Sequence, residues 1–507
     1  MNFGMEDMKT HGRMRGALML GWAFLMVMNL PAAGGEYAEL RVIDAETKRG
    51  LPLVELTTVN ELKFVTDNAG RIAFREPDLM GTEVFFSVRG HGYEAPKDGF
   101  GISGVRVTPK AGEVVEIPLK RMIVAHRLTR LTGEGKWRDT KLLGHPVPLA
   151  DSPNPGQVAG QDSIQAAVYR GKVYWFWGDT NQIKYPLGLY RTAGATTAIP
   201  DGDISNGLPY DYFTDKTGFA RAMMPLSERP EGVIWIFGVC AVADGKNGEK
   251  LIGHYSRRKG LNGELEQGIA VFDDDKNIFT VARQLPLDEK WRYPRGHPII
   301  MEEGGQRWLM FGAAIPNIRV PATLAAVLDP AQYEAFACQF DKDGKPEWRW
   351  QKELPPTDSD KESKLLKAGK LRPEDARFTL VDANGKDRIV LHTGSVRWND
   401  FRKKWVLVAC RIGGQTSHLG EVWYAEADSP VGPFTPGVRV AMHDRQTFYN
   451  VGHHAFLDRD GGRTIYFEGT YTNDFSGNPY ATPRYNYNQV MYRLDLAAPE
   501  LKVIQGK

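Results

Sequence analysis

Residues 160–181, GQDSIQAAVYRGKVYWFWGDTN, decide the fold of this 507-residue chain. Two apolar runs, 165–169 and 173–177, flank the dipeptide Arg170-Gly171, which fits a two-residue turn between antiparallel strands. The second run is strongly aromatic, as strands often are. The spacing therefore predicts a β-hairpin in which Tyr169 faces Lys172 and every earlier residue pairs in the same register.

The pattern of an apolar strand, a tight turn and an aromatic strand recurs along the chain. A repeat of this length is typical of propeller blades. We therefore predict an all-β fold in which residues 160–499 form a five-bladed β-propeller, although the uneven spacing leaves six blades or a distorted sandwich open. The four later blades are expected to begin with residues 232–237, 297–301, 394–398 and 454–457.

Residues 36–122 form an earlier β-rich region with its own turns. The turn at 66–71, the segment Gly90-His91-Gly92-Tyr93 and the ending at 116–119 resemble the carboxypeptidase-regulatory-like, or transthyretin-like, β-sandwich. This resemblance implies a non-catalytic accessory domain. We assign residues 123–159 to a linker between this sandwich and the propeller.

The N-terminus has the layout of a secretory signal. Lys9, Arg13 and Arg15 precede an apolar stretch at 17–30, and small residues follow at 31–35. The apolar stretch is short for a membrane span. We expect residues 1–34 to be a signal peptide and the mature protein to be secreted or periplasmic, with an uncleaved anchor as the alternative.

The charge and the cysteine content of the chain argue against several classes of protein. Lys and Arg total 64 and Asp and Glu total 62, which argues against a dedicated nucleic-acid binder. Only three cysteines are present, so we predict neither a disulfide scaffold nor a cysteine zinc site. No cofactor or metal ligand set is predicted. Calcium in the propeller channel and the oligomeric state are left open.

The candidate catalytic residues come from the first hairpin. In the predicted register Asp162 and Asp179 face each other at its open end, where directly opposed Cβ atoms lie about 4.5–5.5 Å apart. Two carboxylates this close raise one pKa, so one can act as an acid and the other as a base or nucleophile. Glycoside hydrolysis needs this division of roles. The alternative is that these aspartates only cap strand ends.

A second polar set is expected at the same end of other blades. Counting back across the loop at 458–463 places His453 opposite Glu468. Because adjacent residues of a strand point to opposite faces, His453 and His454 are not expected to share a metal ion. We predict that Glu468 is a third catalytic candidate. The predicted substrate-binding residues are Gln161, Trp177, Arg295, His297, Tyr449, Asn450, His453 and Arg484.

Asp162 with the aromatic strand 174–178, and the segment 424–434, resemble the five-bladed propeller glycoside hydrolases, which include arabinanases, xylosidases and invertase-like enzymes. The pairing of 160–162 with 178–180 is similar to the endo-D-arabinanase group. The resemblance implies that Asp162 is the base.

This chain departs from that family in the middle blades. The arabinanase and xylosidase families open a middle blade with Asp and take a Glu acid from the next blade. Here His297 and Gly394-Ser395 occupy the corresponding starts. The departure favours the Asp162–Asp179 pair, with Glu468 and Glu421 as reserve acids.

The function predicted from these patterns is an exported glycoside hydrolase that cleaves a polysaccharide or oligosaccharide by carboxylate acid/base chemistry. Two alternatives stay open. One is a propeller polysaccharide lyase with His453 or Tyr449 as base and Arg484 or Arg295 neutralising a uronate. The other is a non-catalytic glycan-binding propeller.

Overall fold

The computed structural model describes residues 30–31, 35–149, 154–189, 191–261, 263–434 and 436–505. Of the predicted signal peptide at 1–34, only Leu30 and Pro31 are among the described residues. Among the helices of the described segments, none combines the length and apolar character needed to cross a membrane.

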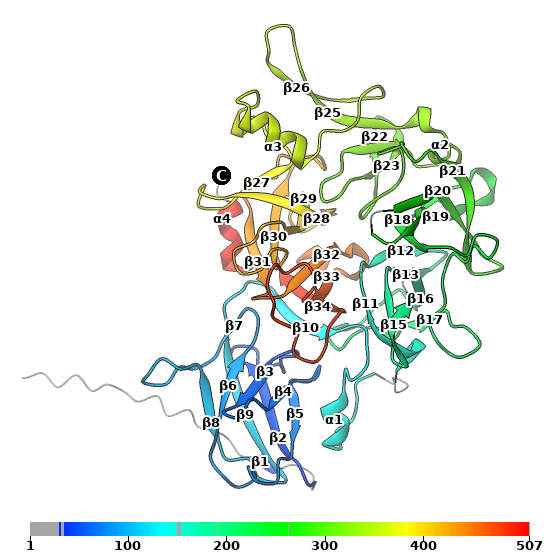
Figure 1. Ribbon diagram of the computed structural model, residues 1–507. Helices are drawn as coiled ribbons and strands as arrows, with labels where there is room; N and C mark the ends of the chain where they lie inside the picture. Colours follow the sequence, from blue (N-terminus) through cyan, green and yellow to red (C-terminus); the bar gives the residue numbers. More distant parts are fainter. Residues whose placement is uncertain are drawn as a thin grey trace, which may run out of the picture.

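The N-terminal region consists of two sheets packed over one core (Figure 1). Leu40 and Ile117 of the first sheet share this core with Leu56 and Phe86 of the second. Two sheets arranged in this way form a β-sandwich; its membership of the carboxypeptidase-regulatory-like family stays a prediction. The first sheet contains β1 (Leu30–Pro31), β2 (Ala38–Asp44), β5 (Arg71–Phe74), β7 (Tyr93–Glu94) and β9 (Glu113–Arg121), and the second contains β3 (Glu55–Thr58), β4 (Lys63–Val65), β6 (Val84–Arg89) and β8 (Gly104–Val107).

Five sheets follow, one for each predicted blade. Blade I contains β12 (Gln165–Tyr169), β13 (Lys172–Trp177), β16 (Ala193–Ala198) and β17 (Asp211–Tyr212). Blade II contains β18 (Val233–Ala243), β19 (Glu249–Lys259), β20 (Gly263–Asp273) and β21 (Ile278–Leu285). Blade III contains β22 (Ile299–Glu303), β23 (Gln306–Phe311), β24 (Ile318–Pro321), β25 (Glu334–Phe340) and β26 (Pro346–Gln351).

Blade IV contains β27 (Thr379–Val381), β28 (Arg388–Asn399), β29 (Lys404–Arg411), β30 (Glu421–Ala427) and β31 (Val438–Met442). Blade V contains β32 (Thr447–His453), β33 (Thr464–Thr472), β34 (Asn488–Asp495) and β10 (His126–Arg130). A small extra sheet is formed by β11 (Val158–Gln161), β14 (Thr180–Gln182) and β15 (Tyr185–Leu189). The α-helices are short: α1 (Arg138–Leu142), α2 (Leu324–Val327), α3 (Ser359–Lys367) and α4 (Lys502–Gln505).

Each blade packs against the next through an apolar core, and the fifth packs back against the first. Burying both faces of each sheet in this way closes the sheets into a ring, so the five-bladed propeller is confirmed. Residue pairs that share a core across successive blades are Phe176 with Ile236, Val242 with Phe311, Ile299 with Leu407, Val408 with Phe467, and Met491 with Trp175.

The fifth blade is completed by a strand that precedes the first blade in sequence. β10 pairs antiparallel with β34, for example His126 with Arg493. This corrects the predicted linker at 123–159, because part of that segment is the outer strand of blade V. A strand from the start of the ring hydrogen-bonded into its last sheet holds the two ends of the propeller together.

The first strand of blade V also differs from the prediction. It is β32, whereas Ala455–Leu457, predicted as strand, forms a 3₁₀ turn. The ladder between β32 and β33 shifts register between Tyr449 and Gly452, and Asn450 has a φ of 51°. Such a bulge inserts an extra residue into one strand, which simple counting of pairs does not anticipate.

Candidate active site

The register of the first hairpin is confirmed. Tyr169 pairs with Lys172 in the β12–β13 ladder, and Gln161 pairs with Thr180 in the β11–β14 ladder. The pairs from Gly160 to Tyr169 share one register, and Asp162 and Asp179 occupy the facing positions between the two ladders. The Asp162 N–H donates to the Asp179 carbonyl at 3.2 Å. The hairpin therefore holds the two aspartates opposite each other, as predicted.

A glycine allows the Asp162 carboxylate to fold back onto the neighbouring strand end. The Asp179 N–H donates to Asp162 Oδ1 at 2.8 Å, and the Gly178 N–H donates to the Asp162 carbonyl at 2.8 Å. A Cβ at position 178 would lie 2.3 Å from Asp162 Oδ1, too close for any van der Waals contact. Glycine at 178 is therefore required by this carboxylate position.

Asp162 is surrounded by hydrogen-bond donors. The Tyr449 hydroxyl donates to Oδ2 at 2.6 Å. The hydroxyls of Tyr487 and Ser163 also hydrogen-bond to this carboxyl group. Burial raises the pKa of Asp162, while these hydroxyls and the Asp179 N–H act in the opposite direction by stabilising the charged form.

Asp179 has a poorer set of partners. Its Oδ1 accepts a hydrogen bond from the Trp235 indole at 2.6 Å. Burial first, and the nearby negative charge of Asp162 second, raise the pKa of Asp179 to about 7, against a smaller opposing effect of Trp235. Burial and the neighbouring carboxylate therefore favour the protonated form of Asp179, while the donors around Asp162 favour its charged form.

Both carboxylates line a cavity of about 620 Å³. Its walls are aromatic and apolar, and two amides and a third aspartate, Asp474, lie among them. The described lining residues include no Lys, Arg or His. They are Asp162, Ser163, Gly178, Asp179, Asn181, Val233, Trp235, Phe237, Gly260, Leu261, Tyr449, Asp474, Phe475, Asn486 and Tyr487.

Three predicted substrate-binding residues lie beside the cavity without lining it. Gln161 is fully buried, accepting from the Tyr212 hydroxyl and donating to Thr180. Trp177 is buried in the core between blades V and I. Asn450 donates to the Ser163 hydroxyl and so supports a cavity residue. Of the eight residues predicted to bind substrate, only Tyr449 lines the cavity.

The predicted facing of His453 and Glu468 is wrong by one residue. Gly452 pairs with Glu468, because Ala455–Leu457 and Asp460–Gly462 of the connection form 3₁₀ turns and the count across it is off by one. His453 instead hydrogen-bonds to Asp458 at 2.9 Å, and His454 hydrogen-bonds to Glu468 at 2.8 Å. Burial raises the pKa of Glu468 to about 8. Glu468 is fully buried and lines neither this cavity nor the larger one described below, which removes it from the candidate acids.

The remaining predicted residues also lie elsewhere. The His297 ring packs against Gly452, where a Cβ would approach its Cε1 to 2.8 Å. Arg295 precedes it in the same segment, and burial lowers the pKa of both side chains. Arg484 is exposed and lies over the Tyr485 ring. The reserve acid Glu421 is buried, accepting from the Trp423 indole and from Arg411.

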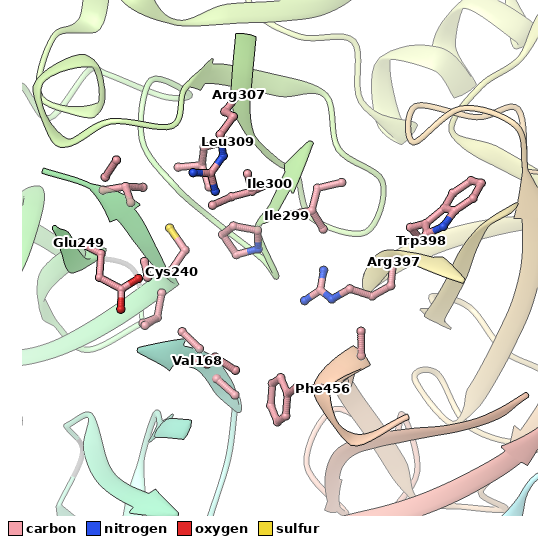
Figure 2. A pocket seen from close by; sticks show the side chains of 18 of the residues that line it. Val168, Cys240, Glu249, Ile299, Ile300, Arg307, Leu309, Arg397, Trp398 and Phe456 are labelled. Carbon is pink, nitrogen blue, oxygen red and sulfur yellow. The ribbon is translucent and has the colours of Figure 1, made fainter. Parts of the chain in front are cut away.

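A second cavity, of about 790 Å³, lies at the other end of the inner strands. Along β18, Trp235 and Phe237 line the carboxylate cavity, whereas residues 239–243 line this one. Figure 2 shows Arg397 projecting into a space bordered by Val168, Ile299 and Phe456. Glu249 is the single acidic residue of its described lining, so this cavity offers no carboxylate pair.

The described residues contain no group of three or more His, Cys, Asp or Glu side chains able to hold a metal ion. Cys240 and Cys410 are buried, and Cys338 is half-buried.

Comparison with known proteins gives matches at the level of structure. Neither a protein-family model nor a curated protein sequence matches this chain. An exo-1,5-alpha-L-arabinanase from a bovine ruminal metagenomic library is 13% identical, with 66% of this chain and 93% of that chain covered and a TM-score of 0.32. The catalytic domain of a GH62 alpha-L-arabinofuranosidase from Coprinopsis cinerea is 9% identical, with 73% and 97% covered and a TM-score of 0.34.

A GH43_1 enzyme from Xanthomonas citri is 13% identical, with 68% of this chain and 90% of that chain covered and a TM-score of 0.34. These neighbours are glycoside hydrolases. The five-bladed ring itself rests on the strand pairing and the inter-blade cores.

Several cavity residues were not predicted from the sequence. Val233, Trp235 and Phe237 alternate along β18, so the period of a strand could have placed them on one face. Tyr487 lies three residues after Arg484, which was predicted to bind substrate. No pattern in the sequence distinguishes Asp474 or Phe475 from other loop residues.

Proposed function

We propose that this protein is an exported glycoside hydrolase that cleaves a polysaccharide or oligosaccharide with Asp162 and Asp179. The observation that carries the proposal is the facing pair of carboxylates with unequal hydrogen-bond partners in one aromatic cavity. Export is proposed from the layout of residues 9–35 alone.

The unequal environments suggest the role of each carboxyl group. Asp179, with its pKa raised to about 7, holds a proton that it can donate to the glycosidic oxygen. Asp162, which accepts from several donors, carries the negative charge. It either takes a proton from the attacking water or attacks the anomeric carbon itself. Both routes cleave the glycosidic bond and consume one water molecule.

The lining of the cavity suits a sugar. Trp235, Tyr449 and Tyr487 offer aromatic surface for a sugar ring, and Asn181 and Asn486 offer amide groups to hydroxyls. A lyase acting on uronate needs a cation beside the substrate carboxylate. The arginines named for that alternative, Arg295 and Arg484, do not line the cavity, and neither does His453. Hydrolysis of a glycan without carboxylates is therefore favoured.

The test is a panel of polysaccharides assayed for reducing ends and for ultraviolet absorbance with the wild type, Asp162→Asn and Asp179→Asn. We expect reducing ends without absorbance, and a loss of about 100-fold or more in kcat for each variant. Asp360→Asn, which changes an exposed aspartate of α3, should retain full activity.

Two other outcomes would contradict the proposal. Ultraviolet-absorbing product from a uronic-acid polymer would establish a lyase. Glycan binding that persists in both variants, with no turnover by the wild type on any polymer, would establish a binding protein.

A further inference from the structure

We propose that Tyr449, Tyr487 and Trp235 are positioning residues that give Asp162 and Asp179 their different roles. The inference rests on the proposed function and adds to it the groups that decide which carboxylate keeps the charge. None of the three was chosen for this role from the sequence, and they come from separate parts of the ring.

The Asp162 side is supplied by blade V and by the loop that leads into its last strand. Tyr449, on β32, donates to Oδ2 at 2.6 Å while the Asp179 N–H occupies Oδ1 at 2.8 Å. Tyr487 adds a further hydroxyl bond. Burial strongly raises the pKa of Tyr449 and that of Tyr487, so both hydroxyls remain protonated and act as donors at any working pH.

The Asp179 side is supplied by blade II. The Trp235 indole donates a single hydrogen bond to Oδ1 at 2.6 Å. An indole N–H is a donor only, so it can bond either the protonated or the charged carboxyl group through this oxygen. It therefore orients Asp179 through Oδ1, and no described side chain or backbone N–H donates to the other oxygen of this cavity residue.

Burial raises the pKa of both aspartates and therefore does not favour the charged form of Asp162. The titratable side chains that line the cavity are Asp162, Asp179, Asp474, Tyr449 and Tyr487, with no cation among its described residues. Asp474 is exposed at the rim and accepts from the Thr472 hydroxyl. Neutral donors, unequally divided between the two carboxylates, are therefore the groups that favour the charged form of Asp162.

The test is the pH dependence of kcat/KM on a polymer that the wild type cleaves. Its acid limb reports ionisation of the base, Asp162, and its alkaline limb reports loss of the proton of the acid, Asp179. Tyr449→Phe and Tyr487→Phe remove a donor to the charged form of Asp162, so the acid limb should move to higher pH. Trp235→Phe removes the donor to Asp179, so the alkaline limb should move to higher pH. Each should lower the maximum about tenfold.

Matched controls separate positioning from general loss of structure. Tyr471→Phe removes a buried hydroxyl of the same blade that bonds His91, and Trp398→Phe removes an indole bond to Asp400 far from this cavity. Neither control variant should shift the acid limb or the alkaline limb of the pH profile of kcat/KM. A tenfold loss of activity in the three test variants with unmoved limbs would overturn the inference and leave the hydrolase proposal intact.

Chemical labelling tests the inference without catalysis, and it applies even if no substrate is cleaved. Carbodiimide coupling to carboxyl groups, followed by peptide mass spectrometry, depends on the protonation of each aspartate. In the wild type near pH 6 we expect Asp179 to be labelled more than Asp162, and Tyr449→Phe to increase labelling at Asp162. Equal labelling of both in wild type and variant would contradict the inference.

Discussion

At the scale of single residues, Gly178 has a sterically constrained position in the site, where no side chain fits beside Asp162. It lies between Trp177, which is buried in the core, and Asp179, whose N–H binds Asp162. Its backbone needs no left-handed conformation, since no positive φ is recorded for it. The requirement for glycine is purely steric and comes from the carboxylate of a residue on the facing strand.

Gly178→Ala therefore tests the geometry of the pair. The added methyl group would lie 2.3 Å from Asp162 Oδ1 and must displace that carboxylate. We expect a fall in kcat of about 100-fold, in line with the sensitivity of catalysis to small misplacements, with a modest fall in Tm. Gly202→Ala is the control, because a Cβ there meets nothing within 4 Å. Full activity in Gly178→Ala would show that Asp162 need not occupy this position.

Glu468 provides a second prediction at this scale. Burial raises the pKa of Glu468 to about 8 and lowers that of its partner His454 to about 3, so burial favours the neutral form of both side chains, which lie 2.8 Å apart. The folded-state pKa of Glu468 is above its usual 4.5, so its stabilising contribution is lost as pH rises.

The contribution of Glu468 to the free energy of unfolding should fall by on the order of 1.4 kcal/mol per pH unit between about pH 4.5 and about 8. Glu468→Gln keeps a donor to His454 and has no proton to lose. Denaturant unfolding should therefore give similar stability for both proteins at pH 5 and a more stable variant at pH 8. Activity should be unchanged, since Glu468 lines neither cavity. A parallel pH dependence in wild type and variant would refute this assignment.

At the scale of secondary structure, β10 has a larger role than its position in the sequence suggests. Leu128 on this strand is fully buried in the core shared by blades V and I. Leu128→Ala should lower the free energy of unfolding by about 2–5 kcal/mol, because it leaves a cavity at the closure of the ring. Leu354→Ala, at an exposed leucine, should cost far less. Denaturant unfolding of the two variants provides the measurement. Equal and small losses of unfolding free energy would mean that β10 contributes little to the stability of the ring.

The elements also show which parts of the fold could be predicted. The register of β12 and β13 was predictable because a two-residue turn joins adjacent strands and leaves one pairing. The same reasoning failed for β32 and β33, because a longer connection with two 3₁₀ turns joins them and does not determine the pairing to within one residue. The predicted partner of Glu468 was His453, whereas the observed partner is Gly452, one residue away.

At the scale of the whole molecule, the turn that marked the N-terminal sandwich also joins it to the propeller. Asn68 is buried there and makes two hydrogen bonds to the backbone of Arg130 in β10, at 2.9 and 3.0 Å. His91 of the sandwich reaches the Tyr471 hydroxyl of blade V at 3.0 Å. The sandwich therefore contacts the strand that closes the ring.

Asn68→Ala should destabilise the protein by about 1–3 kcal/mol, because it leaves buried backbone groups of Arg130 without partners. Specific activity of the folded fraction should be unchanged, since the carboxylate cavity is elsewhere. Asn60→Ala, at an exposed asparagine, is the control. Thermal melting of the two variants provides the measurement, and equal Tm values would show that this contact is dispensable.

The sequence by itself determined the blade repeat and the facing of Asp162 and Asp179, because both depend on neighbouring strands and a short turn. Only the tertiary structure decided which groups surround that pair. Tyr449 is 287 positions from Asp162, and Trp235 is 56 positions from Asp179. They meet because the ring brings the starts of the inner strands together around one axis, and local periodicity contains no information about contacts made by ring closure.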